Sequence, residues 1–310
     1  MSFAMLTLLT LTRKIITKFT KLTPFQNIYE EINVLKEQNK FLLFEVSKLN
    51  ELLRGQTWKN NRIDDQSIEQ THDSFEFQWS DINTGYKLPS DTEFMSAIQE
   101  NICLITDSNK EWFKGKKILD LGCGTGRFTY GFLTLGARVT ACDQSKSALQ
   151  QAQLLCHQFA DQVTFKQIDI LTWNEEDYFE MVFCFGVVHH TGNTYQAIEN
   201  AAKKVKEGGK LFLMVYGFPE SPTDFIEVNT YESLRQKLRN FSIEERKYFL
   251  EKKFGIELAH GYFDAVSPKI NDLLTFPEIE ELLKSFGFAS IKRTLPSRNY
   301  RIIAEKIVVN

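Results

Sequence analysis

The sequence predicts an α/β fold whose seven-stranded sheet is mostly parallel and ends in a C-terminal antiparallel hairpin. Within residues 116–216, short apolar runs alternate with helical patterns, as in parallel strands joined by helical crossovers. A glycine-rich turn joins the first of these runs to the helical pattern after it. Two further apolar runs, at residues 290–295 and 300–308, are close enough in sequence to pair as a hairpin.

The composition is that of an ordinary globular protein, with 43% apolar residues among 310. A net charge of −3 gives no positive field that would draw the chain to nucleic acid. The five cysteines form no CxxC pair, which predicts buried thiols in a reducing compartment. The adjacent pair His189 and His190 has no His or Cys at ligand spacing nearby, which argues against a zinc site.

The first 27 residues form a basic N-terminal segment. Four basic residues and no acid accompany the apolar run Phe3–Leu11. A signal peptide would carry positive charge before its apolar core, and this run is too short to span a bilayer. The alternatives are a surface anchor with weak membrane contact through residues 1–22, a transit-like leader, or a frayed or partner-bound terminus. We expect a cytoplasmic protein, peripheral at a membrane if the first alternative holds.

Residues 28–55 are predicted to form a coiled-coil helix, followed by a polar linker at 56–74. Seam residues recur at alternating steps of four and three. Asn39 takes an a-type position, where Asn sets the register of parallel dimers. This predicts a homo-oligomer through residues 28–53; the alternative is a helix packed on its own domain, as apolar residues off the seam would favour. The seam is Ile28, Ile32, Leu35, Asn39, Leu42, Val46, Leu49 and Leu53, and the apolar residues off it are Phe41, Leu43 and Phe44.

The glycine-rich turn after the first strand predicts a nucleoside site. Gly122, Gly124 and Gly126 lack a Cβ and accept positive φ, so a ligand can touch the backbone. Dinucleotide sites use Gly-x-Gly-x-x-Gly to hold a diphosphate, whereas the spacing here is Gly-x-Gly-x-Gly. Asp120, two residues before the first glycine, would repel a diphosphate but accept hydrogen bonds from an ammonium group. The pattern therefore favours an ammonium-bearing nucleoside over NAD.

Polar residues follow each of the next three predicted strands. Asp143 ends the second strand 23 residues after Asp120, where a ribose-binding acid is expected. Asp169 ends the third strand, and His189 and His190 follow the fourth. Because the carboxyl ends of parallel strands meet at one edge of a sheet, these residues are expected to share a site.

Residues 116–216 resemble class I methyltransferases that depend on S-adenosylmethionine (SAM). Asp120 to Gly126 is similar to their motif I, Asp-x-Gly-x-Gly-x-Gly, and residues 186–191 resemble a "GVxHHT" strand ending. Residues 206–209 resemble a "kpGGxl" turn without its common proline, and Ser74–Trp79 an "SFxxQW" element. That set occurs in sugar, cell-surface-glycan and natural-product pathways. The resemblance implies a Rossmann-like domain over residues 75–310.

The resemblance also implies SAM as cofactor and a role for each site residue. The three glycines admit its methionyl part, with Asp120 near the ammonium, directly or through water. Asp143 takes the ribose hydroxyls and Asp169 the adenine amino group. The "SFxxQW" element folds over the cofactor, or alternatively plugs the sheet edge. The implied contacts are Asp120, Gly122, Gly124, Gly126, Asp143, Asp169, Ile170, Phe185, Gln78 and Trp79.

The alternation of strands and helices stops after Tyr216. Residues 218–263 contain two charged helical patterns, at 231–240 and 243–254. An insertion at this point lies over the active site in the family, so a helical lid is expected; the alternative is a second oligomer surface. Residues 262–268 resemble the set's "D-x-x-SP" loop, and Thr275 with Glu278 predicts a capping box at a helix start.

The expected activity is methyl transfer, most simply to a hydroxyl of a small-molecule or saccharide acceptor. Positioning and exclusion of water carry most of such a reaction, but a hydroxyl must also lose its proton to a base. His190 or His189 is the candidate base; alternatively these side chains only shape the pocket. Other readings are N- or C-methylation of a natural-product or quinone-like scaffold, and a non-catalytic scaffold acting through the coiled coil. No basic patch interleaved with aromatic residues indicates a nucleic-acid partner.

Overall fold

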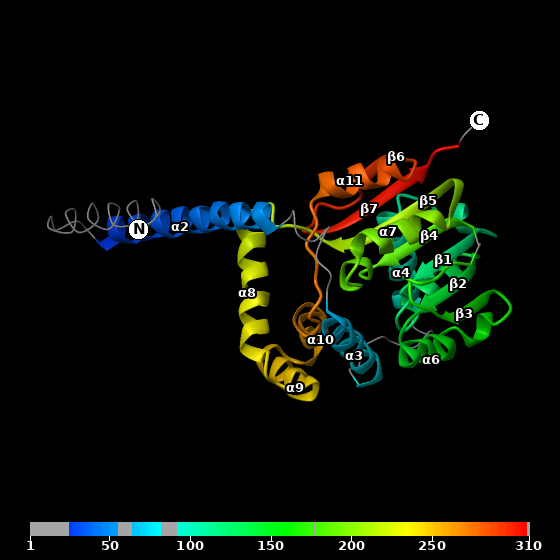
Figure 1. Cartoon of the computed structure of the whole chain (residues 1–310), viewed down its shortest axis with the longest axis horizontal. Coiled ribbons are helices and arrows are strands. Elements are labelled where there is room, and N and C mark those ends of the chain that lie inside the picture. The colour runs from blue at the N-terminus through cyan, green and yellow to red at the C-terminus, as the bar shows by residue number, and fades with distance from the viewer. Residues whose placement is uncertain (1–24, 55–63, 82–91, 176–177, 309–310) are drawn as a thin grey trace.

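The computed structural model contains the predicted seven-stranded sheet (Figure 1). The structure describes residues 25–54, 64–81, 92–175 and 178–308. The strands lie in the order β3-β2-β1-β4-β5-β7-β6; the first five are parallel, and β7 is antiparallel to both β5 and β6. Their bounds are β1 Lys117–Leu121, β2 Arg138–Asp143, β3 Val163–Gln167, β4 Phe179–Phe185, β5 Val205–Tyr216, β6 Phe288–Arg293 and β7 Asn299–Lys306. The α/β fold and its C-terminal antiparallel hairpin are confirmed.

The sheet separates two apolar layers, because successive side chains of a strand point to opposite faces. Leu119 and Leu121 of β1 belong to the layer that also contains α7 and α11, whereas Ile118 belongs to the layer with α4, α5 and α6. In the second layer Phe183 of β4 stacks on Phe212 of β5, with ring centroids 4.5 Å apart. Much of the abundant phenylalanine is therefore used in the core.

Ten α-helices are present in the described part of the chain. The capping box at the start of α11 forms as predicted, since Thr275 and Glu278 each bind the other's backbone N–H. The bounds of the ten helices are α2 Phe25–Arg54, α3 Asp65–Asp81, α4 Thr92–Ile105, α5 Arg127–Thr134, α6 Lys146–Leu155, α7 Thr194–Lys203, α8 Pro222–Leu238, α9 Ile243–Phe254, α10 Ile256–Val266 and α11 Phe276–Ser285.

The predicted linker at residues 56–74 is wrong from Asp65 onward, where helix α3 begins. The polar residues of this helix bind the segment after α10. Gln70 Oε1 accepts a 2.8 Å hydrogen bond from the Lys269 backbone, and Thr71 Oγ1 accepts one of 3.1 Å from the Ile270 backbone. A polar stretch looked like a linker because these partners lie about 200 positions further along the sequence. The main domain therefore begins before residue 75.

The expected lid contains three helices instead of the two predicted patterns. Helix α8 begins at Pro222, well before the pattern at 231–240, because Ser221 caps it and proline suits the first turn. Helix α10 includes part of the segment 262–268, which was expected to be a loop. The break between α9 and α10 falls at Gly255, whose φ is +83°.

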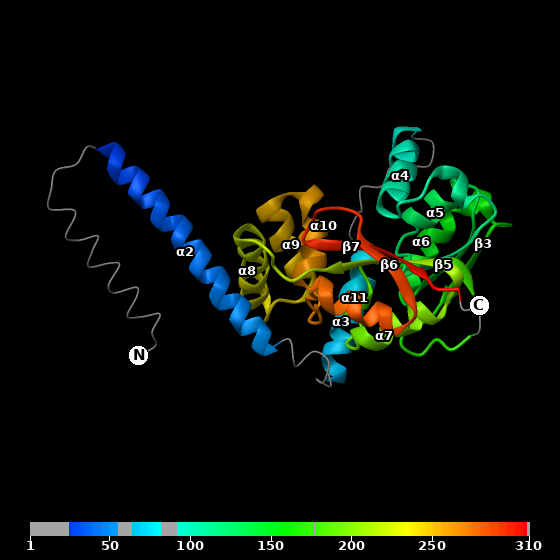
Figure 2. The same cartoon turned by 90° about the horizontal axis from the view of Figure 1, so that it is seen from above.

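Helix α2 is confirmed over Phe25–Arg54, and Figures 1 and 2 show it standing out from the rest of the molecule. It meets the body at α8, where the rings of Phe44 and Phe225 lie 6.5 Å apart. The predictions for residues 1–24 lie outside the described part of the chain. None of the described helices has the length and hydropathy needed to cross a membrane.

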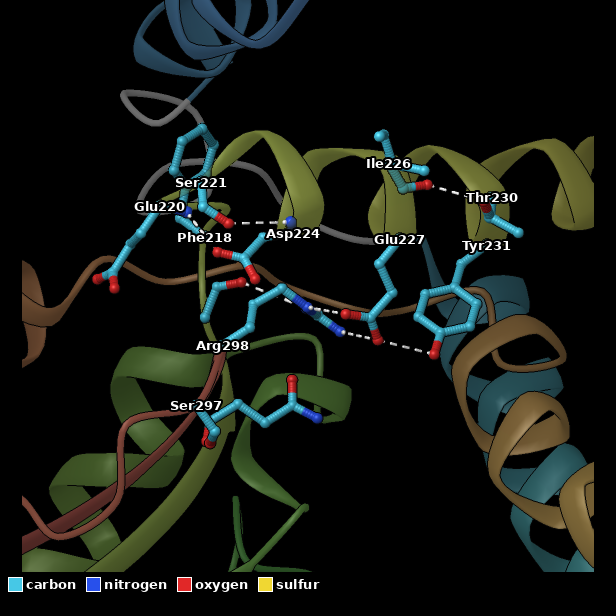
Figure 3. Close-up of polar contacts among 12 residues, drawn as sticks. Phe218, Glu220, Ser221, Asp224, Ile226, Glu227, Thr230, Tyr231, Ser297 and Arg298 are labelled. Atoms are coloured by element: carbon cyan, nitrogen blue, oxygen red, sulfur yellow. Dashed lines mark hydrogen bonds and ion pairs between the residues drawn. The ribbon is translucent and has the colours of Figure 1, made fainter. Parts of the chain in front are cut away.

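Two ion pairs fasten the first half of α8 and the loop before it to the β6–β7 hairpin. Arg298, whose side chain is 7% exposed, donates from Nε and Nη2 to Glu227 of α8 at 3.2 and 3.3 Å (Figure 3). Tyr231 donates a 2.9 Å hydrogen bond to the same carboxylate. Arg293 Nη1 binds Glu220 at 2.8 Å. The base of the lid is thus held to the edge of the sheet.

We expect Arg298→Ala to lower the free energy of unfolding by about 1–3 kcal/mol, because it leaves Glu227 and the Gly217 carbonyl without a charged donor. Denaturant unfolding with equal m-values would measure the change. Lys292→Ala is the control: its ion pair with Asp107 is exposed on both sides, so about 0.5 kcal/mol or less is expected. Equal losses in the two variants would contradict the structural role of Arg298.

Candidate active site

A cavity of about 460 Å³ lies at the carboxyl ends of the parallel strands. Its walls include the tips of β1, β2 and β4, and its cover comes from α3 and α10. This is where ligands bind in open α/β sheets, beyond the carboxyl ends of the strands. The volume is in the range of pockets that bind small molecules and cofactors. The predicted site residues that line it are Trp79, Gly122, Asp143, Asp169, Ile170, Phe185 and His190.

The turn after β1 takes its shape from glycines that have no room for a side chain. Gly122, Gly124 and Gly126 have φ values of +79°, +53° and +86°, which favour glycine. A Cβ on Gly122 would lie 2.1 Å from Val187 Cγ2, and one on Gly126 would lie 2.8 Å from the Cβ of Ala152. Gly122 lines the cavity itself, and the other two set the path of the turn into α5.

Asp143 ties the tip of β2 to this turn. Its Oδ2 accepts a 2.8 Å hydrogen bond from the Gly124 backbone, and its Oδ1 accepts one of 2.8 Å from the Ser145 backbone. Burial raises the pKa of the carboxyl, and these hydrogen bonds oppose that rise. A carboxylate has about four lone-pair sites, so Asp143 keeps capacity for hydroxyl groups of a ligand in the cavity.

Asp169 and Ile170 lie in a loop that side chains hold in place. Asp169 Oδ1 accepts a 2.8 Å hydrogen bond from the Leu171 backbone. Asn200 of α7 donates to the carbonyls of Ile170 and Leu171 at 2.8 and 3.1 Å. Sequence reasoning missed Asn200, because nothing in its local pattern indicates a contact with a loop 30 residues earlier. Phe185 at the end of β4 completes this wall, with its ring centroid 4.8 Å from that of Phe128.

Asp120 is buried behind the cavity and does not belong to its lining. Its carboxylate accepts a 2.6 Å hydrogen bond from Thr129 in α5, so it fastens that helix to β1. Burial raises the pKa of Asp120 to about 7. A nearby cation would favour the ionised form. The direct contact with a ligand ammonium stays a prediction.

Helix α3 covers the cavity, which agrees with the expectation that this element folds over the ligand. Trp79 lies over the turn, since a Cβ on Gly124 would meet its ring at 3.3 Å. The ring also packs against His260 of α10, with centroids 5.4 Å apart. The amide nitrogen of Gln78 lies 3.3 Å from the His260 ring nitrogens. Gln78 itself is buried between the two helices and does not line the cavity.

The two adjacent histidines differ in their position relative to the cavity. His190 lines the cavity, and its Nδ1 lies 2.8 Å from the backbone carbonyl of Ile270. Because a carbonyl can only accept, Nδ1 carries the proton, and Nε2 of the neutral ring keeps a lone pair. No residue in the described part of the chain forms a hydrogen bond with this Nε2. His189 lies outside the lining, fully buried against Tyr216 with ring centroids 4.2 Å apart.

The electrostatics of His190 suit a base. Burial lowers the pKa of His190 below its ordinary value, although the charge of Asp264 acts in the opposite direction. Asp264 of α10 lines the same cavity and accepts a hydrogen bond from the Tyr216 hydroxyl. Burial also raises the pKa of Tyr216, so this hydroxyl stays a donor. The sequence offered only one signal for Asp264, its place in the "D-x-x-SP" segment, and none for His260.

The cysteines add one further group to the cavity wall. All five are free thiols, four of them buried and Cys103 partly exposed. Cys142 lines the cavity, and burial raises the pKa of its thiol to about 12. Within the described ranges, no cluster of three or more His, Cys, Asp or Glu side chains could hold a metal ion.

Comparisons with known proteins point to one class. Residues 118–209 match the family model described as "Methyltransferase domain". "Ubiquinone biosynthesis O-methyltransferase" of Alkalilimnicola ehrlichii is 37% identical over 98 residues, which are 31% of this chain and 40% of the relative. The enzyme of the same name from Dechloromonas aromatica is 34% identical over 101 residues, 32% of this chain and 44% of the relative. The chain thus spans less than half of the length of these curated relatives.

Two solved structures resemble the fold. The DhpI complex with S-adenosylhomocysteine has a TM-score of 0.50 and 16% identity, over 79% of this chain and 98% of that one. Magnesium protoporphyrin IX methyltransferase from Synechocystis PCC 6803 with bound SAM has a TM-score of 0.47 and 18% identity, over 80% of this chain and 99% of that one.

Residues 118–209 are thus similar to a methyltransferase domain, and the strand order and the strand-end cavity are compatible with that similarity. The residues of the cavity fit SAM, the cofactor of this class. The glycine turn exposes backbone at positions where a Cβ would collide with neighbouring residues. Asp143 has free lone pairs for ribose hydroxyls. Ile170 and Phe185 offer apolar surface to the adenine ring.

We expect Asp143→Ala to weaken SAM binding by about 100-fold or more, because charge-assisted hydrogen bonds to two hydroxyls would be lost. Isothermal titration calorimetry measures the affinity, and near-ultraviolet circular dichroism checks that the fold is intact. Glu280→Ala in α11 is the control, since neither this residue nor Lys284, with which it forms an ion pair, lines the cavity. Retained affinity in a folded Asp143→Ala protein would count against the ribose role.

Proposed function

We propose that this chain is an enzyme that transfers the methyl group of SAM to a hydroxyl oxygen of a small-molecule or saccharide acceptor. One observation carries the proposal. His190 lines the same cavity as the glycine turn and the strand-end carboxylates, and its Nε2 keeps a lone pair that no described residue binds. A site with both features can hold the donor and accept the proton of a hydroxyl group.

The groups around the cavity divide the work between them. SAM, when bound, supplies a methyl group on a positively charged sulfur. The chain's own residues position the two reactants and exclude water, with α3 and α10 as the cover. His190 would take the hydroxyl proton on Nε2 while the acceptor oxygen bonds to the methyl carbon, and the carbon–sulfur bond would break with its electron pair left on the neutral thioether. The Ile270 carbonyl holds the ring in the required tautomer, and the Asp264 carboxylate stabilises the imidazolium that results.

Two classes of molecule are candidates for the hydroxyl acceptor. A saccharide or similar polyhydroxylated molecule follows from the resemblance of the "SFxxQW" and "GVxHHT" elements. A phenolic hydroxyl of a quinone-like scaffold is supported by the name of the curated relatives, which match 31% and 32% of this chain. Both acceptors need the same base, so His190 does not distinguish them.

Two measurements test the function. Calorimetry should detect SAM binding, and SAM with a labelled methyl group should transfer the label to an acceptor from a panel of nucleotide-sugars, free sugars and catechols. Transfer to amines alone would favour N-methylation, and SAM binding with no transfer would favour the scaffold reading. Binding of a nicotinamide dinucleotide in place of SAM would overturn the proposal.

We expect the rate of transfer to rise with pH through an acidic limb centred below pH 6.5. The pKa of His190 is lowered, and the ring accepts a proton only in its neutral form above that pKa. His190→Gln should abolish the limb and lower kcat by about 10²- to 10⁴-fold, while SAM affinity stays unchanged. His189→Gln should keep the limb, because His189 lies outside the cavity. A limb that survives in His190→Gln would assign the base elsewhere.

A further inference from the structure

Helix α2 (Phe25–Arg54) presents two different faces. In the heptad pattern Ile32 and Asn39 take a positions, Leu35 and Leu42 take d positions, and Phe44 takes an f position. At 100° per residue, position f lies about 170° from the centre of the a/d seam. The seam and Phe44 are therefore on opposite sides of the helix.

The contact of α2 with its own body uses the f side. Phe44 is 7% exposed and packs edge-on against Phe225 of α8, with ring centroids 6.5 Å apart. Among the seam residues whose side chains are described, Ile32 is 40% and Leu42 44% exposed, Asn39 is exposed as well, and Leu35 is partly exposed. Helix α2 can thus pack on its own domain and pair through its seam at the same time, although the sequence presents these two arrangements as alternatives.

Helix α8, on which α2 packs, is itself fixed to the rest of the domain. Helix α8 is tied to the sheet edge through the ion pair of Glu227 with Arg298 (Figure 3). Figures 1 and 2 show α2 extending from α8 beyond the body. A 30-residue helix with an apolar seam is costly to leave in water.

We propose that a second copy of this chain covers the seam, and that the two α2 helices form a parallel two-stranded coiled coil. An Asn at one a position is the usual device that sets register in such dimers. In the parallel arrangement a g residue meets the e residue five positions later on the partner. Glu31 at g and Lys36 at e then carry opposite charges, whereas an antiparallel pair would bring like charges together.

A membrane surface fits this helix less well. Helices that lie on membranes carry a polar face rich in Lys and Arg. Helix α2 has five acidic and four basic residues, so it offers no net positive charge to anionic lipids. Asn39 in the middle of the seam is also a poor residue to bury among acyl chains.

The arrangement leaves room for both bodies. In a parallel pair the f positions point away from the two-fold axis. Since Phe44 at f attaches each helix to its own α8, each body lies on the outer side of the pair. None of the seam residues whose side chains are described lines the cavity, so the proposal does not depend on the proposed methyl transfer.

The first experiment measures the mass of the full-length chain by light scattering after size exclusion, at tens of micromolar protein. We expect a dimer, and we expect the double variant Ile32→Glu with Leu42→Glu to be monomeric. The control is Val34→Glu with Phe41→Glu, which replaces two apolar residues that are each 56% exposed but lie off the seam; it should remain a dimer. A monomeric unmodified chain, or loss of the dimer in both double variants, would overturn the proposal.

The second experiment tests the orientation. Asn39→Cys places two thiols side by side in a parallel pair, so mild oxidation should give a covalent dimer on a non-reducing gel. Phe41→Cys lies off the seam and should not cross-link. If the chain is dimeric but Asn39→Cys gives no more cross-link than Phe41→Cys, the pairing is not parallel. Equal SAM affinity in calorimetry for all variants would show that the body remains folded.

Discussion

The lack of a Cβ on the glycines of the turn after β1 is the constraint on which the rest of the site depends. Gly122 packs so closely against Val187 that even a methyl group would collide with it. That closeness lets the tips of β1 and β4 approach each other and leaves backbone as the floor of the cavity. Asp143 then holds the turn from the β2 side by accepting the Gly124 N–H. One short loop therefore sets both the space for a ligand and the position of the Asp143 carboxylate.

The central sheet could be predicted because its signals are local. Apolar runs, the glycine spacing and acids at strand ends lie within a few residues of one another, and they placed Asp143, Asp169 and His190 at one edge. The errors arose where partners are distant in sequence. Residues 65–74 are polar and were taken for a linker, yet Gln70 and Thr71 bind backbone near residue 270. The early start of α8 was hidden because that helix carries no strong apolar stripe.

The two histidines show what adjacent residues in a sequence cannot reveal. His189 and His190 belong to the same short 3₁₀ helix, η3 (Val188–His190), and their rings are in contact. Only the fold decides which of them reaches the cavity, because the Ile270 carbonyl that orients His190 comes from a segment 80 positions away. Asp264 and His260 reach the site for the same reason, as α10 folds back over the sheet. Part of the site is thus built from late parts of the chain.

The thiol of Cys142 lies in the wall of the cavity where the proposed donor, an electrophile, would bind. Thiolate sulfur is a strong nucleophile toward activated carbon, whereas the protonated thiol is not. With its pKa raised to about 12 by burial, Cys142 is almost entirely protonated at neutral pH. The same burial that raises this pKa would therefore protect Cys142 from methylation if the proposed donor binds in the cavity.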